Sequence, residues 1–285
     1  MDIAFNITRK CNKGCDYCYL NLTGEDLSVD RIKEILESVD VETVTLTGGE
    51  PLMHPNINDI LAFLSGRGKH VHLLSNGILL NDDYLTAIRE ANVELFVTYN
   101  EPNKKISGNL HRANQHGIEV NLHHVLTKKS VVSLDDICQD IDFAKSLLFL
   151  YPTDLGKGNV IMYAPEEWFL LLDRAIAIIQ DCGIRTYFEQ AFTIKGSDLA
   201  KKKPCLTGKD LFIDVNGKSY PCCLLVDKVR GNESLSPVIM TPERCNFIRD
   251  NPLPDSSHYV RICPIVITDR YDGHFHFPSH MGENK

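Results

Sequence analysis

The sequence lacks the features of a secreted, membrane-spanning or nucleic-acid-binding protein. No run of apolar residues is longer than five, whereas a membrane-spanning helix needs roughly 20. The start of the chain has no basic segment followed by an apolar stretch, so we expect no secretory signal and a cytoplasmic protein. Lys and Arg number 30 against 38 Asp and Glu, and this acidic balance disfavours a nucleic-acid partner.

The composition is that of an ordinary globular protein. Hydrophobic residues make up 43% and charged residues 24% of the 285 residues. A chain of this length buries roughly 75% of its unfolded surface and needs no disulfides to stay folded. The ten cysteines therefore need another explanation. In a reducing compartment, metal ligands or catalytic thiols explain them better than disulfides do.

Strand and helix patterns alternate through the first two thirds of the chain. Period-two and buried apolar runs predict strands near 2–8, 43–47, 70–74, 93–99, 118–126, 147–151 and 184–189. Helical spacing and capping residues predict helices near 28–39, 57–64, 81–90, 104–115, 133–146 and 165–183. Ser28 and Asn56 are the candidate N-caps of the first two helices, and Ser133 with Asp136 matches a capping box.

This alternation predicts an α/β fold with a parallel sheet. Periodicity alone allows either a doubly wound sheet or an open barrel. The pattern changes after Phe192, where a hairpin signal appears around Asn216-Gly217 and half of the cysteines gather. We therefore predict two domains, at 1–190 and 191–285.

The strongest signal is a loop with three cysteines directly after the first predicted strand. Cys11, Cys15 and Cys18 lie within eight residues of one another, at the strand end where α/β proteins place their active sites. Three thiolates leave one coordination position open, whereas a structural zinc site is normally closed by four ligands. A zinc site that takes its fourth ligand from elsewhere is the alternative.

The spacing Cys-x3-Cys-x2-Cys, with Tyr17 before the last Cys, resembles the signature of the radical S-adenosylmethionine (SAM) superfamily. Further segments at later strand ends resemble the family's cofactor-binding motifs. They are Gly48-Gly49-Glu50-Pro51, which is similar to its GGEP segment; Ser75-Asn76-Gly77, similar to its Thr-Asn-Gly; Thr98 and Asn100, at the place of its Ser-x-Asp; and Asn121 on the fifth strand.

The resemblance implies a partial (β/α)6 barrel over about residues 2–190. Cys11, Cys15 and Cys18 would hold a [4Fe-4S] cluster whose open iron chelates SAM. Reduction of SAM by the cluster would give a 5′-deoxyadenosyl radical, which abstracts a hydrogen atom from a substrate. An electron donor such as flavodoxin or ferredoxin is implied as a partner.

The cysteines of the last third resemble a smaller module. Cys205, then Gly217, then Cys222 is similar to the opening of the SPASM and twitch domains, which house auxiliary iron-sulfur clusters. The further Cys-x2-Cys pairs of a full SPASM domain are missing, so a twitch-like domain with one auxiliary [4Fe-4S] cluster fits better. Cys263 is the third expected ligand, and the fourth could be Cys245, Cys223, a substrate or no ligand at all.

Cys223, next to Cys222, is a candidate hydrogen-atom donor. Some radical SAM epimerases quench the substrate radical with such a cysteine, and on this reading the enzyme is an epimerase. The alternative reaction is a two-electron oxidation, a dehydrogenation or cross-link, in which the auxiliary cluster accepts the electron. Cys223 is otherwise a small packed residue.

The substrate class stays open between a peptide and a small natural product. Many enzymes of this kind modify ribosomal peptides, and the acidic balance suits a cationic molecule. A function of another class is a non-catalytic zinc or iron-sulfur protein that uses its cysteines only for folding and acts as an interaction module.

Overall fold

The structure is a computed structural model, and it describes most of the first 194 residues and a few later segments. The described residues are 2–152, 165–180, 182–188, 192–194, 211–220, 223, 226–227, 231–233, 235 and 259–261. The predicted ligands Cys205, Cys222, Cys245 and Cys263 lie outside them.

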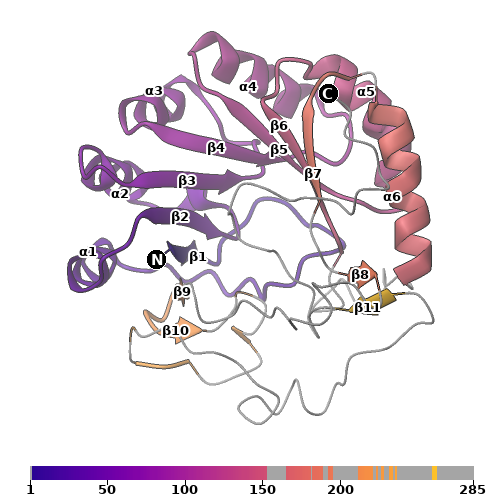
Figure 1. Cartoon of the computed structure of the whole chain (residues 1–285). Helices are drawn as coiled ribbons and strands as arrows, with labels where there is room; N and C mark the ends of the chain where they lie inside the picture. Colours follow the sequence, from indigo (N-terminus) through magenta and orange to yellow (C-terminus); the bar gives the residue numbers. More distant parts are fainter. Residues whose placement is uncertain are drawn as a thin grey trace.

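The fold is built on one large, mainly parallel sheet (Figure 1). Its first seven strands in chain order are β1 (Asp2–Thr8), β2 (Thr43–Gly48), β3 (His70–Ser75), β4 (Val93–Thr98), β5 (Val120–Val125), β6 (Ser146–Leu150) and β7 (Arg185–Phe188). They lie side by side in sequence order, and each pairs in parallel with the next. All seven strands predicted from the sequence are present.

The helices lie along the outer side of the curved sheet (Figure 1). They are α1 (Val29–Ser38), α2 (Ile57–Leu64), α3 (Asp82–Glu90), α4 (Lys104–Gln115), α5 (Leu134–Asp140) and α6 (Pro165–Ile179), with short 3-10 helices η1 (Pro51–Met53) and η2 (Ser130–Ser133). A doubly wound sheet carries helices on both faces. Helices on the outer side alone therefore identify the sheet as an open barrel. The fold is therefore the predicted partial barrel.

The sheet continues past β1 with two strands from the last third of the chain. β9 (Leu211–Ile213) pairs in parallel with β1, and β10 (Ser219–Tyr220) pairs antiparallel with β9. The predicted hairpin around Gly217 is thus present. It belongs to the barrel sheet although it lies within 191–285, and the domain boundary near 191 stays a prediction. A separate two-stranded sheet pairs β8 (Phe192–Ile194) with β11 (Tyr259–Arg261).

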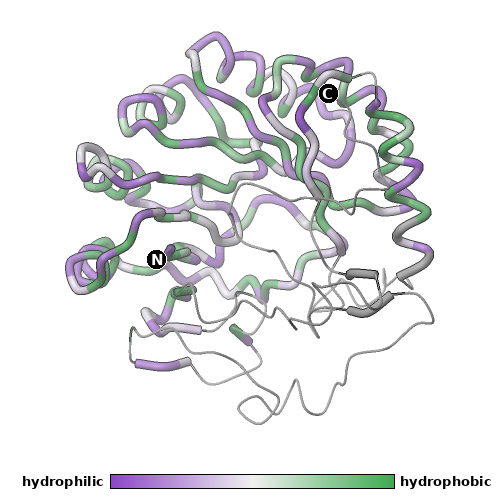
Figure 2. The backbone as a smooth tube through the Cα atoms, in the orientation of Figure 1, coloured by the Kyte–Doolittle hydropathy of each residue, from purple (hydrophilic) through white to green (hydrophobic). Residues whose placement is uncertain are grey.

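The core fills the space between the strands and the helices. Figure 2 shows apolar residues along the strands and on the sheet-facing sides of the helices, with polar residues outside. Both faces of β1 are buried: Phe5 and Ile7 belong to the hydrophobic core, and Asn6 and Thr8 are buried polar residues. Asn6 and Thr8 have polar partners, because they bond to Asp214 and Asp26. No helix in the described ranges is long and apolar enough to cross a membrane.

Of the two candidate N-caps, the structure confirms Ser28 but not Asn56. The hydroxyl of Ser28 accepts from the backbone N–H of Arg31 and caps α1 as predicted. Asn56 makes no side-chain cap bond to α2, and its amide donates to Asp59 instead.

The capping box at Ser133 is wrong. Ser133 ends η2 in a helical backbone conformation, and its side chain makes no cap bond. A cap residue needs an extended backbone, which the preceding 3-10 turn denies to Ser133. Helix α5 also ends at Asp140, short of the predicted Ser146.

The core includes an imidazole with a hydrogen-bond partner on only one of its two ring nitrogens among the described residues. His124 on β5 is fully buried and stacks edge-on against Phe149. Its Nδ1 lies 2.9 Å from the backbone carbonyl of Tyr99, and its Nε2 has no hydrogen-bond partner among the described residues. Burial lowers the pKa of His124 to about 4, against an ordinary value of 6.5.

We predict that His124→Phe flattens the pH dependence of stability between pH 6.5 and pH 4. The folded pKa lies below the unfolded one, so this contribution is present above pH 6.5 and is lost as the pH falls towards 4. The loss of stability amounts to about 3 kcal/mol at pH 4, relative to the stability well above pH 6.5. Urea unfolding at a series of pH values measures the two slopes, and equal slopes in parent and variant would contradict the prediction.

Candidate functional site

The three-cysteine loop occupies the carboxyl end of the barrel between β1 and α1. Its entry is fixed by two backbone hydrogen bonds of 2.8 Å, from Gly49 N–H to the Thr8 carbonyl and from Glu50 N–H to the Lys10 carbonyl. The loop therefore enters beside the end of β2.

Glycine is required at both positions that meet this loop. A Cβ on Gly49 would lie 2.3 Å from the Lys10 carbonyl oxygen, and one on Gly48 would lie 2.4 Å from that of Thr8. Both distances are well below any normal contact. The two glycines therefore let the loop approach the strand end.

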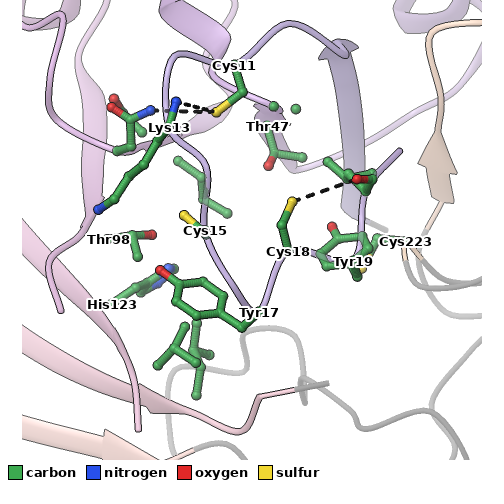
Figure 3. Close-up of a pocket in the computed structure, with 18 of the residues that line it drawn as sticks. Cys11, Lys13, Cys15, Tyr17, Cys18, Tyr19, Thr47, Thr98, His123 and Cys223 are labelled. Carbon is green, nitrogen blue, oxygen red and sulfur yellow. Dashed lines mark hydrogen bonds between the residues drawn. The ribbon is translucent and has the colours of Figure 1, made fainter. Parts of the chain in front are cut away.

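The three cysteine thiols line one cavity of about 290 Å³ (Figure 3). No three ligating side chains in the described ranges converge tightly enough to hold a single metal ion. Thiols that are spread around a common space fit a multi-iron cluster, which is larger than one ion, better than a closed zinc site. Burial raises the pKa of the Cys11 thiol, so a bound metal has to displace its proton.

Most of the residues predicted to bind the cofactor line the same cavity. They are Tyr17, Gly48, Gly49, Ser75, Asn76 and Thr98. These residues come from the cysteine loop and from the ends of β2, β3 and β4, so the cavity lies at one end of the sheet. Neighbouring parallel strands bring these distant segments together because their carboxyl ends meet at one edge.

Cys223 reaches this cavity from the last third of the chain (Figure 3). Its side chain is 9% exposed. The sequence placed Cys223 only next to a predicted cluster ligand. The structure puts Cys223 in the lining of the cavity that the three loop cysteines also line.

Glu50 lies beside the cavity and is not part of its lining. It is fully buried, and its carboxylate accepts from the Ser75 hydroxyl at 2.8 Å, the Asn76 N–H at 2.7 Å and the Leu52 N–H at 3.2 Å. Burial raises the pKa of Glu50, and these bonds oppose the shift. In this structure the carboxylate joins the ends of β2 and β3.

Asn76 carries that connection on to the cysteine loop. Its side-chain N–H group donates to the Asn12 side-chain oxygen at 2.8 Å and points to the Cys11 sulfur at 3.9 Å. Its side-chain oxygen accepts from the Ile78 N–H at 3.0 Å, which fixes the orientation of the amide. Asn76 is thus placed to hold Cys11, and a donor to a ligating sulfur tunes an iron-sulfur cluster.

Three further predicted residues lie outside the cavity lining. Asn100 donates to the Tyr17 hydroxyl and accepts from the Val125 N–H at 2.9 Å, so it ties the loop to β5. The Asn121 side chain bonds within the sheet: its N–H group donates to the Leu95 carbonyl, and its oxygen accepts from the Ser146 hydroxyl. Pro51 is buried as the first residue of η1.

The sequence argument missed the residues that form the rest of the lining. His123 on β5 is the most polar of those from the strands, and burial together with nearby His72 lowers its pKa to about 4, so it is neutral at pH 7. The others are largely apolar. For the lining residues on strands, the only sign in the sequence was the period-two alternation of the strand; these residues are Ala4, Thr45, Thr47, Leu74, Val125, Leu148, Leu150 and Phe212. The remaining lining residues lie in loops and had no such sign; they are Lys13, Tyr19, Leu20, Tyr151 and Pro152.

Comparison with known proteins identifies the family of this region. Residues 5–137 match the family model of the radical SAM superfamily. The chain is 25% identical over 188 residues to AlbA of Bacillus subtilis, named for the biosynthesis of the antilisterial bacteriocin subtilosin; the match covers 58% of this chain and 42% of AlbA. It is 26% identical over 264 residues to the AdoMet-dependent heme synthase of Methanosarcina barkeri, covering 77% and 76%.

Two solved structures share the fold. Streptococcus suis SuiB bound to its precursor peptide SuiA has a TM-score of 0.66 at 15% identity, covering 82% of this chain and 63% of SuiB. The enzyme anSMEcpe with AdoMet and a peptide has a TM-score of 0.61 at 16% identity, covering 87% and 86%. The chain spans less than two thirds of AlbA and of SuiB. Residues 5–137 of the chain belong to the radical SAM superfamily.

We predict that Gly49→Ala prevents the cysteine loop from assembling a cluster. Its Cβ would displace the Lys10 carbonyl and with it the entry of the loop. Iron per chain after anaerobic reconstitution should fall by about four, the content of one [4Fe-4S] cluster. Gly14→Ala is the matched control within the same loop, because a Cβ there meets nothing within 4 Å and its iron content should match the parent. Equal iron in the Gly49 variant and the parent would contradict this reading.

Proposed function

We propose that this protein is a radical SAM enzyme that changes the configuration of a carbon atom in a peptide. Cys11, Cys15 and Cys18 would hold a [4Fe-4S] cluster, and Gly48, Gly49, Ser75, Asn76 and Thr98 would line the SAM site. When bound, the cluster and SAM supply a 5′-deoxyadenosyl radical that removes a hydrogen atom from the substrate. The observation that carries the proposal is that Cys223 lines the same cavity as the three loop cysteines.

Cys223 would return the hydrogen atom. Its S–H bond breaks and a C–H bond forms on the opposite face of the substrate carbon, which leaves a thiyl radical on Cys223. One electron and one proton restore the thiol, with the electron coming from a one-electron carrier such as flavodoxin or ferredoxin. The largely apolar walls of the cavity, among them Leu148, Leu150 and Phe212, keep water away from the carbon radical.

A peptide is the favoured substrate class. SuiB was solved with a precursor peptide, anSMEcpe with the Cp18Cys peptide, and AlbA is named for the biosynthesis of a bacteriocin. A small natural product is the alternative substrate.

We further propose that residues 191–285 form a twitch-like domain. Cys205, Cys222, Cys263 and Cys245 would hold an auxiliary [4Fe-4S] cluster there. If that cluster accepts the substrate electron, the reaction is a two-electron oxidation. The position of Cys223 in the cavity favours the redox-neutral epimerisation over that alternative.

The first test is the reductive cleavage of SAM. The reconstituted protein with dithionite should form 5′-deoxyadenosine, and a variant with Cys11, Cys15 and Cys18 all replaced by Ala should form none and lose about four irons per chain. The reaction is followed by chromatography of the nucleoside. An intact cluster without any SAM cleavage would favour the non-catalytic interaction module instead.

The second test separates the two reactions. Pooled synthetic peptides are incubated in heavy water, and their hydrolysates are analysed for D-amino acids and mass. An epimerase gives D-residues that carry one solvent deuterium, and Cys223→Ala should abolish them while 5′-deoxyadenosine still forms. Cys182→Ala, at a thiol outside the cavity lining, is the matched control. A product two mass units lighter, or full activity in Cys223→Ala, would reject the donor role.

A further inference from the structure

Arg9 lies between β1 and Cys11, and its guanidinium group is almost fully buried. It forms a two-pronged ion pair with Asp214 at the end of β9, with Nη2 to Oδ2 at 2.8 Å and Nε to Oδ1 at 3.3 Å. The side chains are 6% and 2% exposed. Asn6 also donates to Asp214, at 2.6 Å. This pair joins the strand that leads into the cysteine loop to the hairpin of β9 and β10.

The third nitrogen of Arg9 connects two more segments. Nη1 donates to the Asp227 carboxylate at 2.8 Å and to the Asn21 carbonyl at 3.2 Å. The Asn21 N–H in turn lies 3.4 Å from the other oxygen of Asp227. Asn21 follows Cys18 in the loop, and Asp227 follows Cys223 by four residues. One guanidinium thus contacts both the segment that ends the cysteine loop and the segment that carries Cys223.

The planar guanidinium group of arginine is suited to contacts with several segments at once. It is planar and presents its N–H groups at fixed angles, so partners in three directions are held at set distances. Burial disfavours the charged Arg9, but its bonds to Asp214 and Asp227 outweigh this effect and raise its pKa, so it stays charged. Lysine carries the same charge on a single nitrogen and cannot reproduce four hydrogen bonds that come from three separate nitrogens.

We infer that Arg9 is a positioning residue that holds the Cys223 thiol at the cavity, in a fixed relation to the three-cysteine loop. The geometric part of this inference stands on the contacts of Arg9 alone. Its consequence for the reaction rests on the proposed function, because a displaced Cys223 returns a hydrogen atom less efficiently.

A purely stabilising role for Arg9 predicts something different. Loss of Arg9 would then lower the stability of the whole chain and leave the surroundings of Cys223 unchanged in the molecules that remain folded. The half-exposed Asp227 distinguishes the two roles, since Asp227→Asn weakens only the connection to the Cys223 segment and leaves the buried Arg9–Asp214 pair intact.

The test measures how fast Cys223 is alkylated in the folded, reconstituted full-length chain. Parent, Asp227→Asn and Arg9→Lys are treated anaerobically with N-ethylmaleimide, and fragment-ion mass spectrometry separates Cys223 from its neighbour Cys222. We expect labelling of Cys223 to become about tenfold faster in both variants, as local opening becomes easier. Arg31→Lys is the matched control, because Arg31 also contacts the hairpin, at the Gly217 carbonyl, but from the surface of α1.

An unchanged rate at Cys223 in folded Asp227→Asn and Arg9→Lys would overturn the inference. Once a substrate peptide is known, both variants should also form more 5′-deoxyadenosine per epimerised peptide than the parent does. If Cys223→Ala proves fully active, the proposed function fails, and the alkylation rates still decide the role of Arg9.

Discussion

The placement of the cysteine loop depends on a backbone contact that only glycine permits. The loop pairs with the end of β2 through Gly49 and Glu50, and the Thr8 and Lys10 carbonyls approach so closely that a side chain at either glycine would collide with them. Hydrogen bonds of this kind fix the loop relative to the rigid sheet. Cys11 follows directly after Lys10, so its position is set by the barrel rather than by the rest of the loop.

Polar side chains below the loop extend that control to its other parts. Glu50 gathers the ends of β2 and β3, and Asn76 passes the connection on to Asn12 and Cys11. Asn100 does the same for Tyr17 and β5. These groups are buried and hydrogen-bonded, and buried polar groups with well-placed partners specify one arrangement of their surroundings. Hydrogen bonds within the protein therefore organise this part of the site.

The last third of the chain contributes to the same site through the sheet. β9 extends the barrel beside β1, which brings Asp214 under Arg9 and Phe212 into the cavity wall. Cys223 follows from that hairpin. Arg9 connects the start of the cysteine loop to that hairpin through the buried Asp214, and to the residues that follow Cys223 through Asp227.

The sequence by itself determined the order of strands and helices, the three-cysteine loop and the place of Gly48-Gly49 at a strand end. These features are local: apolar period, cysteine spacing and turn residues act over a few positions. The tertiary structure decided that the sheet is an open barrel, that Glu50 turns inward to Ser75 and Asn76, and that Cys223 reaches the cavity. Those outcomes depend on partners far along the chain, such as Arg9 and Asp214, which are 205 positions apart, and no local pattern records such a pairing.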